Sequence, residues 1–237
     1  MKAIIIGGGV AGAVTAVALR RAGISSVVYE AYPTGADDIG AFLTIMSNGM
    51  DALRAVDLHQ PVIDVAFPAT AVELRNSEFE VLGRNPTNGY TLKRAQLYRA
   101  LHDSMTIQDI PLEHDKAFGT AELTPDGVRV TFADGTTADG DFVVGADGIY
   151  STTRRAIDPT APEPRNTGIT VAYGYTRATS FDLSKEAYRF VSGSKAMFGY
   201  TTAPDGETWW FSRAPRTETP TKDYFLAQLA ADRTPAA

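Results

Sequence analysis

The sequence predicts an α/β fold, because its first thirty residues alternate between strand and helix patterns around a glycine-rich turn. Residues 2–6 are a short apolar run, and residues 7–12 follow at once with the spacing G-x-G-x-x-G. An apolar-periodic stretch then leads to Gly23, and a second apolar run over residues 27–29 is followed by Glu30. A strand, a glycine turn, a helix and a second strand that ends in an acid form the β-α-β unit that binds an adenine dinucleotide.

The three glycines of the G-x-G-x-x-G motif have different roles. Gly7 permits the tight turn, Gly9 lets a pyrophosphate approach the backbone, and Gly12 lets the helix and the strand pack closely. The pyrophosphate would lie at the helix N-terminus, where N–H groups without a helical acceptor and the helix dipole favour anions. The predicted cofactor-binding residues of this unit are Gly7, Gly9, Val10, Ala11, Gly12, Glu30 and Ala31.

Glu30 indicates which dinucleotide the unit would take. Its carboxylate would accept hydrogen bonds from the ribose hydroxyls of the adenosine half. A carboxylate would also repel the 2′-phosphate of NADP, because both groups are anionic. The cofactor held at this turn is therefore predicted to be FAD or NAD.

The composition bounds the class of protein. The 237 residues are 44% hydrophobic and carry a formal net charge of −6, which predicts a globular protein with neither nucleic acid nor a membrane surface among its partners. No apolar run outside the glycine-rich N-terminus is long enough to suggest a membrane span. The chain has no cysteine, which removes disulfides and thiol catalysis and favours a reducing, cytoplasmic location.

The rest of the chain predicts further helices and a β-rich region. Helices are expected over residues 93–105 and 221–233, where apolar residues recur at helical spacing. Strands are expected over residues 71–83, 116–145 and 169–213, where turn signals separate short apolar runs. A proline-rich stretch after residue 158 looks like a crossover between two regions.

Two further motifs accompany the glycine turn. The predicted helix carries K-R-x-x-L-x-x-A-L from Lys93 to Leu101, and GADGIYSTTR occupies residues 145–154. With GGGVAG and Glu30, these motifs resemble the single-component FAD-dependent aromatic monooxygenases typified by p-hydroxybenzoate hydroxylase. Many flavoproteins share the first motif, whereas the Asp-Gly motif is considerably more specific, and the resemblance spans nearly the whole chain.

The resemblance implies a Rossmann-like FAD-binding domain of the GR2 type with an interleaved β-sheet substrate domain. We expect residues 1–70 and 93–163 to form the FAD-binding domain. Residues 71–92 and 164–237 would form the β-sheet region that binds substrate.

The resemblance also assigns site residues beyond the glycine turn. Arg94 would contact the pyrophosphate or ribityl part of FAD. Asp147 and Gly148 would approach the pyrophosphate and take part in NAD(P)H use, and residues 41–44 would run near the flavin. The expected walls of an aromatic substrate pocket are Phe190, Phe198, Tyr200 and Trp210.

The implied activity is hydroxylation of an aromatic or polyketide-like small molecule with NAD(P)H and O₂, through a flavin C4a-hydroperoxide. In such enzymes the cofactor carries the chemistry, so the resemblance implies no catalytic side chain and no metal. His59, His102 and His114 are far apart in sequence and are expected to be surface or helix residues rather than catalytic bases.

One family feature is missing from the sequence. The family has a third motif, Gly-Asp after a strand, which nothing here matches. We therefore expect the chain to be the N-terminal part of such an enzyme, as a truncated chain, a proteolytic product or half of a split enzyme. A complementing C-terminal chain or a second copy of this chain would then be a partner.

Three other functions compete with the monooxygenase. A flavin reductase or halogenase could use the same scaffold, although the adjacent Trp209 and Trp210 lack the W-x-W-x-I-P spacing of halogenases. The chain could also be a flavoprotein fragment without independent activity that binds a partner segment. An NAD-linked dehydrogenase would leave the Asp-Gly motif unexplained.

Overall fold

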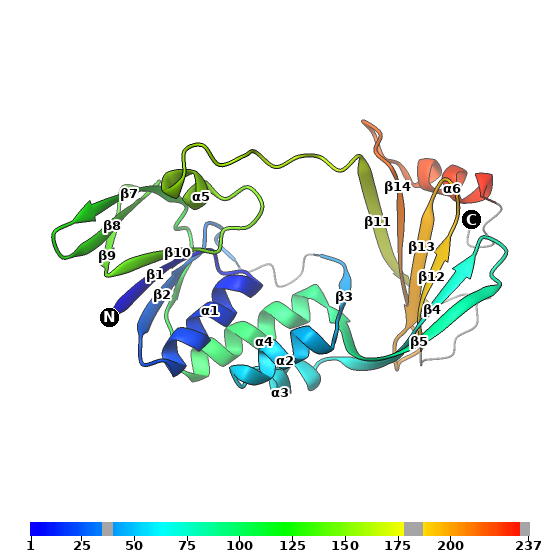
Figure 1. The fold of residues 1–237 in the computed structure, drawn as a ribbon, viewed down its shortest axis with the longest axis horizontal. Coiled ribbons are helices and arrows are strands. Elements are labelled where there is room, and N and C mark those ends of the chain that lie inside the picture. Colours follow the sequence, from blue (N-terminus) through cyan, green and yellow to red (C-terminus); the bar gives the residue numbers. More distant parts are fainter. Residues whose placement is uncertain (35–39, 178–186, 233–237) are drawn as a thin grey trace. The chain divides into compact units, whose positions relative to one another are not determined.

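The computed structural model describes residues 1–34, 40–177 and 187–232 (Figure 1). The chain divides into two compact units. The first comprises Met1–Gly40, Met50–Val65 and Lys93–Pro164, and the second comprises Ala41–Gly49, Ala66–Leu92 and Arg165–Ala237. The chain therefore passes between the two units several times, so each unit is assembled from segments that are distant in sequence.

A parallel four-stranded sheet forms the centre of the first unit, in the order β10-β1-β2-β6. Its strands are β1 (Lys2–Ile6), β2 (Ser25–Tyr29), β6 (Leu112–Glu113) and β10 (Phe142–Gly145). The apolar residues of β1 are buried because this strand lies between β10 and β2. The α/β class and the N-terminal β-α-β unit are thus confirmed.

Helices and a small antiparallel sheet pack around the parallel sheet. Helix α1 (Val10–Arg21) connects β1 to β2 and packs against α4 (Arg94–Ile107), which also contacts the short α3 (His59–Ile63). Small residues of α1, among them Ala13 and Ala16, are buried, so that the helix lies close to its neighbours. Helix α2 comprises Ser47–Ala55, and its residues up to Gly49 are assigned to the second unit and those from Met50 to the first.

The antiparallel sheet of the first unit consists of β7 (Phe118–Thr124), β8 (Gly127–Phe132) and β9 (Thr137–Gly140). Val130 and Phe132 of β8 share a buried cluster with Ile4, Ile6 and Tyr29 of the parallel sheet. Helix α5 (Thr152–Ile157) packs against β7. The expected run of strands over residues 116–145 is therefore confirmed.

Strand β10 is less buried than its apolar sequence suggests. The apolar run at residues 141–145 fits a buried strand, but Phe142, Val143 and Val144 are only partly buried. The reason is that β10 is an edge strand of the parallel sheet among the residues that the structure describes.

A seven-stranded sheet forms the second unit, in the order β11-β14-β13-β12-β4-β5-β3. Its strands are β3 (Phe42–Ile45), β4 (Phe67–Asn76), β5 (Val81–Lys93), β11 (Ile169–Thr176), β12 (Ala187–Ser192), β13 (Met197–Thr202) and β14 (Thr208–Pro215). Strands β12 and β4 pair in parallel, which joins the C-terminal meander to the β4–β5 hairpin.

The second unit includes two segments that were expected to belong to the FAD-binding domain. Residues 41–49 and 66–70 belong to the second unit, because β3 and the start of β4 are part of its sheet. Helix α6 (Lys222–Ala231) packs on the same sheet through contacts with β14. Among the described residues, no helix combines the length and the apolar character that a membrane crossing requires.

Candidate functional site

A pocket of about 520 Å³ lies in the first unit beside the glycine turn. It brings together residues from the ends of β1, β2 and β10, from the start of α4 and from the segment before β7. Of the predicted cofactor-binding residues, those that line the pocket are Gly7, Gly9, Glu30, Ala31, Arg94, Asp147 and Gly148. Val10, Ala11 and Gly12 form the first turn of α1, directly after Gly9.

Backbone contacts explain two of the three motif glycines. Gly7 has a φ of +106°, and a Cβ there would lie 2.5 Å from the carbonyl oxygen of Ala146. A Cβ at Gly12 would lie 1.9 Å from the carbonyl oxygen of Gly7. Neither position can hold a side chain, because backbone atoms cannot move aside as the end of a flexible side chain can.

Gly9 has a different environment. It is the N-cap of α1, and no side chain caps the helix there. A Cβ at Gly9 would have the Tyr98 hydroxyl oxygen, 3.7 Å away, as its nearest neighbour. Protein packing therefore leaves room at Gly9, next to helix N–H groups that have no acceptor within the helix.

The Glu30 carboxylate is tied to the turn. Its Oε2 atom accepts a hydrogen bond of 2.7 Å from the Gly8 N–H, and its Oε1 atom accepts one of 3.1 Å from the Tyr32 N–H. An ionised carboxylate has about four lone-pair positions. Glu30 can therefore accept hydrogen bonds from ribose hydroxyls while it keeps both backbone contacts.

Helix α4 contributes a pair of side chains to the pocket. The Arg94 Nη2 atom donates a 2.8 Å hydrogen bond to the Tyr98 hydroxyl, and the guanidinium carbon lies 5.3 Å from the centroid of the Tyr98 ring. Sequence reasoning missed Tyr98. The signal that could have found it is its position four residues after Arg94 in a predicted helix, which places both side chains on one face.

The Asp147 carboxylate organises the turn between β10 and α5. It accepts hydrogen bonds from the Ser151 hydroxyl at 2.5 Å, the Thr153 N–H at 3.0 Å and the Thr153 hydroxyl at 3.1 Å. Burial raises the pKa of Asp147, but these hydrogen bonds outweigh burial and leave the pKa below its usual value. Gly148 follows with a φ of +79°, which favours glycine.

The four predicted substrate-pocket residues are not gathered in one place. Phe190 packs with Tyr188 and Phe211 on one face of the seven-stranded sheet. Phe198, Tyr200 and Trp210 belong to a cluster on the opposite face, together with Leu229 of α6. The alternation of side chains along a strand explains the division, since Tyr200 lies opposite Arg189 and not opposite Phe190.

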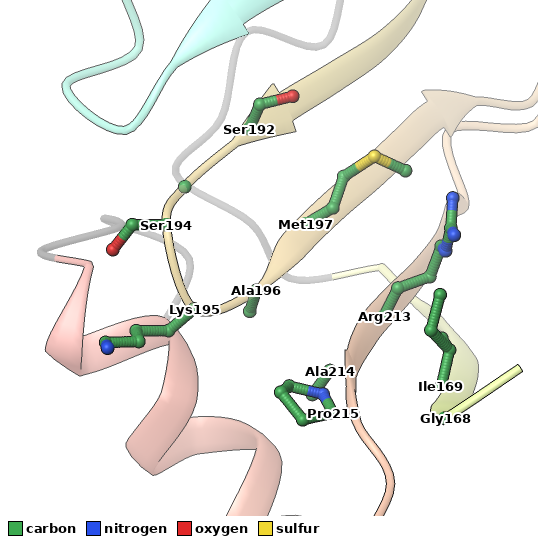
Figure 2. A pocket seen from close by; sticks show the side chains of 11 residues that line it. Gly168, Ile169, Ser192, Ser194, Lys195, Ala196, Met197, Arg213, Ala214 and Pro215 are labelled. Carbon is green, nitrogen blue, oxygen red and sulfur yellow. The ribbon is translucent and has the colours of Figure 1, made fainter.

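The second unit has a cavity of about 390 Å³ between the ends of β11, β13 and β14 (Figure 2). Lys195 and Arg213 line it but point in different directions. The N–H groups of Ser194, Lys195 and Ala196 already donate to the Asp232 carboxylate. This cavity holds none of the predicted site residues, so the candidate site is the pocket of the first unit.

A comparison with protein families identifies the class. Residues 1–232 match the FAD binding domain family, and the chain belongs to this family. The predicted resemblance to FAD-dependent aromatic monooxygenases is thereby confirmed, and FAD rather than NAD is the cofactor of the fold.

Individual relatives are monooxygenases. The chain is 31% identical over 225 residues to a 3-amino-4-hydroxybenzoate 2-monooxygenase of Streptomyces cremeus. This match covers 90% of the chain and 56% of the relative. It is 30% identical over 235 residues to an aurachin C monooxygenase/isomerase of Stigmatella aurantiaca, covering 92% and 58%. The chain thus spans somewhat more than half the length of these relatives.

A solved structure supports the fold. Klebsiella pneumoniae HpxO complexed with FAD and uric acid superposes with a TM-score of 0.84 at 23% sequence identity, covering 98% of this chain and 61% of HpxO. This likeness agrees with the expected GR2-type arrangement of a Rossmann-like domain and a β-sheet region.

The residues of the pocket fit one end of FAD. The uncapped N-terminus of α1 and the space at Gly9 suit an anionic pyrophosphate. The Glu30 carboxylate can accept hydrogen bonds from ribose hydroxyls. The Arg94 guanidinium lines the same pocket and supplies a positive charge for the phosphates.

Proposed function

We propose that the whole protein is an FAD-dependent monooxygenase that uses NAD(P)H and O₂ to hydroxylate a planar aromatic substrate. The observation that carries the proposal is the pocket of the first unit, where the glycine turn, Glu30, Arg94 and the Asp-Gly motif meet. The relatives named above, which include a hydroxybenzoate monooxygenase, support the reaction class.

In this proposal the first unit binds the cofactor. The N–H groups at the start of α1 bind the pyrophosphate, and Glu30 accepts from the ribose hydroxyls. Arg94 balances the phosphate charge, with its guanidinium oriented by Tyr98. Bound FAD supplies the electron transfer and the oxygen activation that the side chains of the chain cannot supply.

The second unit binds the substrate in this proposal. One face of its sheet carries the aromatic residues Tyr175, Tyr188, Phe190 and Phe211, and Tyr173 on the same face is 44% exposed. Such a face suits a planar, largely apolar molecule. Phe190 is therefore kept as a pocket wall, whereas the packing of Phe198, Tyr200 and Trp210 around Leu229 favours a structural role.

The visible absorption spectrum of the purified chain tests the cofactor site. After incubation with FAD and gel filtration, we expect the chain to retain an oxidised-flavin spectrum. A colourless chain would contradict the proposal that the described pocket is sufficient to hold FAD. That result would favour the alternative, a flavoprotein fragment that needs a further segment.

The reaction is tested in the full-length protein. We expect aromatic substrates to stimulate NAD(P)H oxidation and the product to gain one oxygen atom, which mass spectrometry detects. Stimulated NAD(P)H oxidation without oxygen transfer to any substrate would point instead to a flavin reductase.

A further inference from the structure

The Gly8 residue of the turn is held by two side chains. Its N–H donates to Glu30 at 2.7 Å, and its carbonyl oxygen lies 2.7 Å from the Nε2 atom of His102. A carbonyl oxygen only accepts hydrogen bonds, so the Nε2 atom of His102 carries the proton and donates. His102 is partly buried in α4, 94 residues away from Gly8 in the sequence.

This hydrogen bond also determines where the Gly9 N–H points. The Gly8 carbonyl and the Gly9 N–H belong to the same peptide plane, and in a trans peptide they point in opposite directions. Neither Gly8 nor Gly9 has a Cβ, so rotation of this plane meets little steric resistance. The bond to His102 therefore selects one orientation of a peptide that would otherwise turn easily.

The position of Gly9 makes this orientation matter. Gly9 is the N-cap of α1, has no capping side chain near it and lines the pocket of the first unit. Its N–H is one of the donors at this helix N-terminus. If the Gly9 N–H pointed elsewhere, the N-terminus of α1 would have one hydrogen-bond donor fewer for the pyrophosphate.

The three α4 residues near the turn form a row. Arg94, Tyr98 and His102 follow one another at intervals of four, which places them on one side of the helix. Tyr98 accepts the hydrogen bond of Arg94, and its ring lies 6.2 Å from the His102 ring. The helix thus presents both an arginine for the phosphates and a histidine for the backbone of the turn.

We infer that His102 is a positioning residue for the cofactor, which acts through the Gly8–Gly9 peptide and sets the direction of the Gly9 N–H toward the pyrophosphate. The inference rests on the proposed function, since it assumes that FAD is bound at this turn. His102 itself touches the Gly8 carbonyl and takes no part in the chemistry.

The test compares three variants of the chain by two measurements. His102→Leu removes the donor at similar size, His102→Gln keeps an N–H donor, and Asp103→Leu alters the exposed neighbour on the same helix. The first measurement is the backbone amide resonance of Gly9 in the FAD-free, ¹⁵N-labelled protein. The second is the dissociation constant of FAD, with thermal unfolding as a check that each variant folds.

We expect His102→Leu to shift or split the Gly9 resonance and to weaken FAD binding about tenfold, the effect of one lost hydrogen bond. His102→Gln should restore the resonance, and its dissociation constant should return to within about threefold of wild type. Asp103→Leu should match wild type in both measurements.

Two results would overturn the inference. One is a folded His102→Leu variant whose Gly9 resonance is unchanged, and the other is a shifted resonance with an unchanged FAD dissociation constant. A wild-type chain that binds no FAD would instead contradict the proposal that the described pocket is sufficient to hold FAD. The Gly9 resonance, which is measured without FAD, would still decide whether His102 orients the peptide.

Discussion

Gly9 differs from the other glycines of the turn because no protein backbone atom occupies the space of its missing side chain. Gly7 and Gly12 are required by the fold, since a Cβ at either would meet backbone atoms within 2.5 Å. Gly9 is left open, with the Tyr98 hydroxyl as the nearest neighbour of a Cβ. The three glycines should therefore respond differently to substitution.

We expect Gly9→Val to abolish FAD binding while the chain remains folded, because the new side chain would fill the space proposed for the pyrophosphate. Fluorescence titration with FAD and thermal unfolding of the FAD-free protein measure the two effects. Gly12→Ala is the control and should lower the unfolding temperature, since its Cβ would lie 1.9 Å from the Gly7 carbonyl oxygen. Unchanged flavin affinity in Gly9→Val would remove this turn from the cofactor site.

Glu30 should contribute to binding through charged hydrogen bonds. Glu30→Ala removes the proposed acceptor for the ribose hydroxyls and should weaken FAD binding by roughly 1–3 kcal/mol. Glu30→Gln keeps an acceptor oxygen for the Gly8 N–H and should lose less. Isothermal titration with FAD distinguishes the two, and equal affinities in wild type and both variants would exclude Glu30 from the site.

At the scale of the elements, the turn between β10 and α5 depends on one carboxylate. Asp147 is held ionised by Ser151 and Thr153, and its pKa in the folded chain is lowered. A carboxyl whose pKa is lower in the folded state stabilises the fold above its unfolded pKa of about 3.9. That stabilisation is lost as the pH falls through the lower, folded-state value.

The stability of the chain should therefore depend on Asp147 in a defined pH range. We expect Asp147→Asn to lower the unfolding temperature at neutral pH. The difference from wild type should shrink as the pH falls below about 4, because only wild type loses the ionised group. Asp126→Asn, in an exposed turn, is the matched control. A difference that stays constant over this range would show that ionisation of Asp147 does not stabilise the turn.

At the scale of the whole molecule, FAD binding and folding should be linked. A ligand that binds only the folded state stabilises it by about 2.7 kcal/mol at a hundred times its dissociation constant. We expect FAD to raise the unfolding temperature of the chain, measured by circular dichroism, with the Gly9→Val variant unaffected. An equal rise in both proteins would mean that FAD binds somewhere other than the glycine turn.

The N-terminal β-α-β unit could be predicted from the sequence because the residues that determine it are close together in the chain. The glycine spacing, the helix that follows and the acid after β2 all lie within thirty residues, and the structure places Gly7, Gly9 and Glu30 around one pocket. The Asp-Gly motif was also recognisable, since the residues that bind Asp147 follow it within six positions.

Only the tertiary structure shows that Tyr98 and His102 lie near the glycine turn. It alone also shows which aromatic residues share a face of the seven-stranded sheet. The approach of His102 to Gly8 depends on the packing of α4 against α1, which joins segments 94 residues apart. Phe190 and Tyr200 lie on opposite faces because of the register between β12 and β13. A two-residue period shows that side chains alternate along a strand, but only strand pairing determines which aromatic residues of different strands share a face.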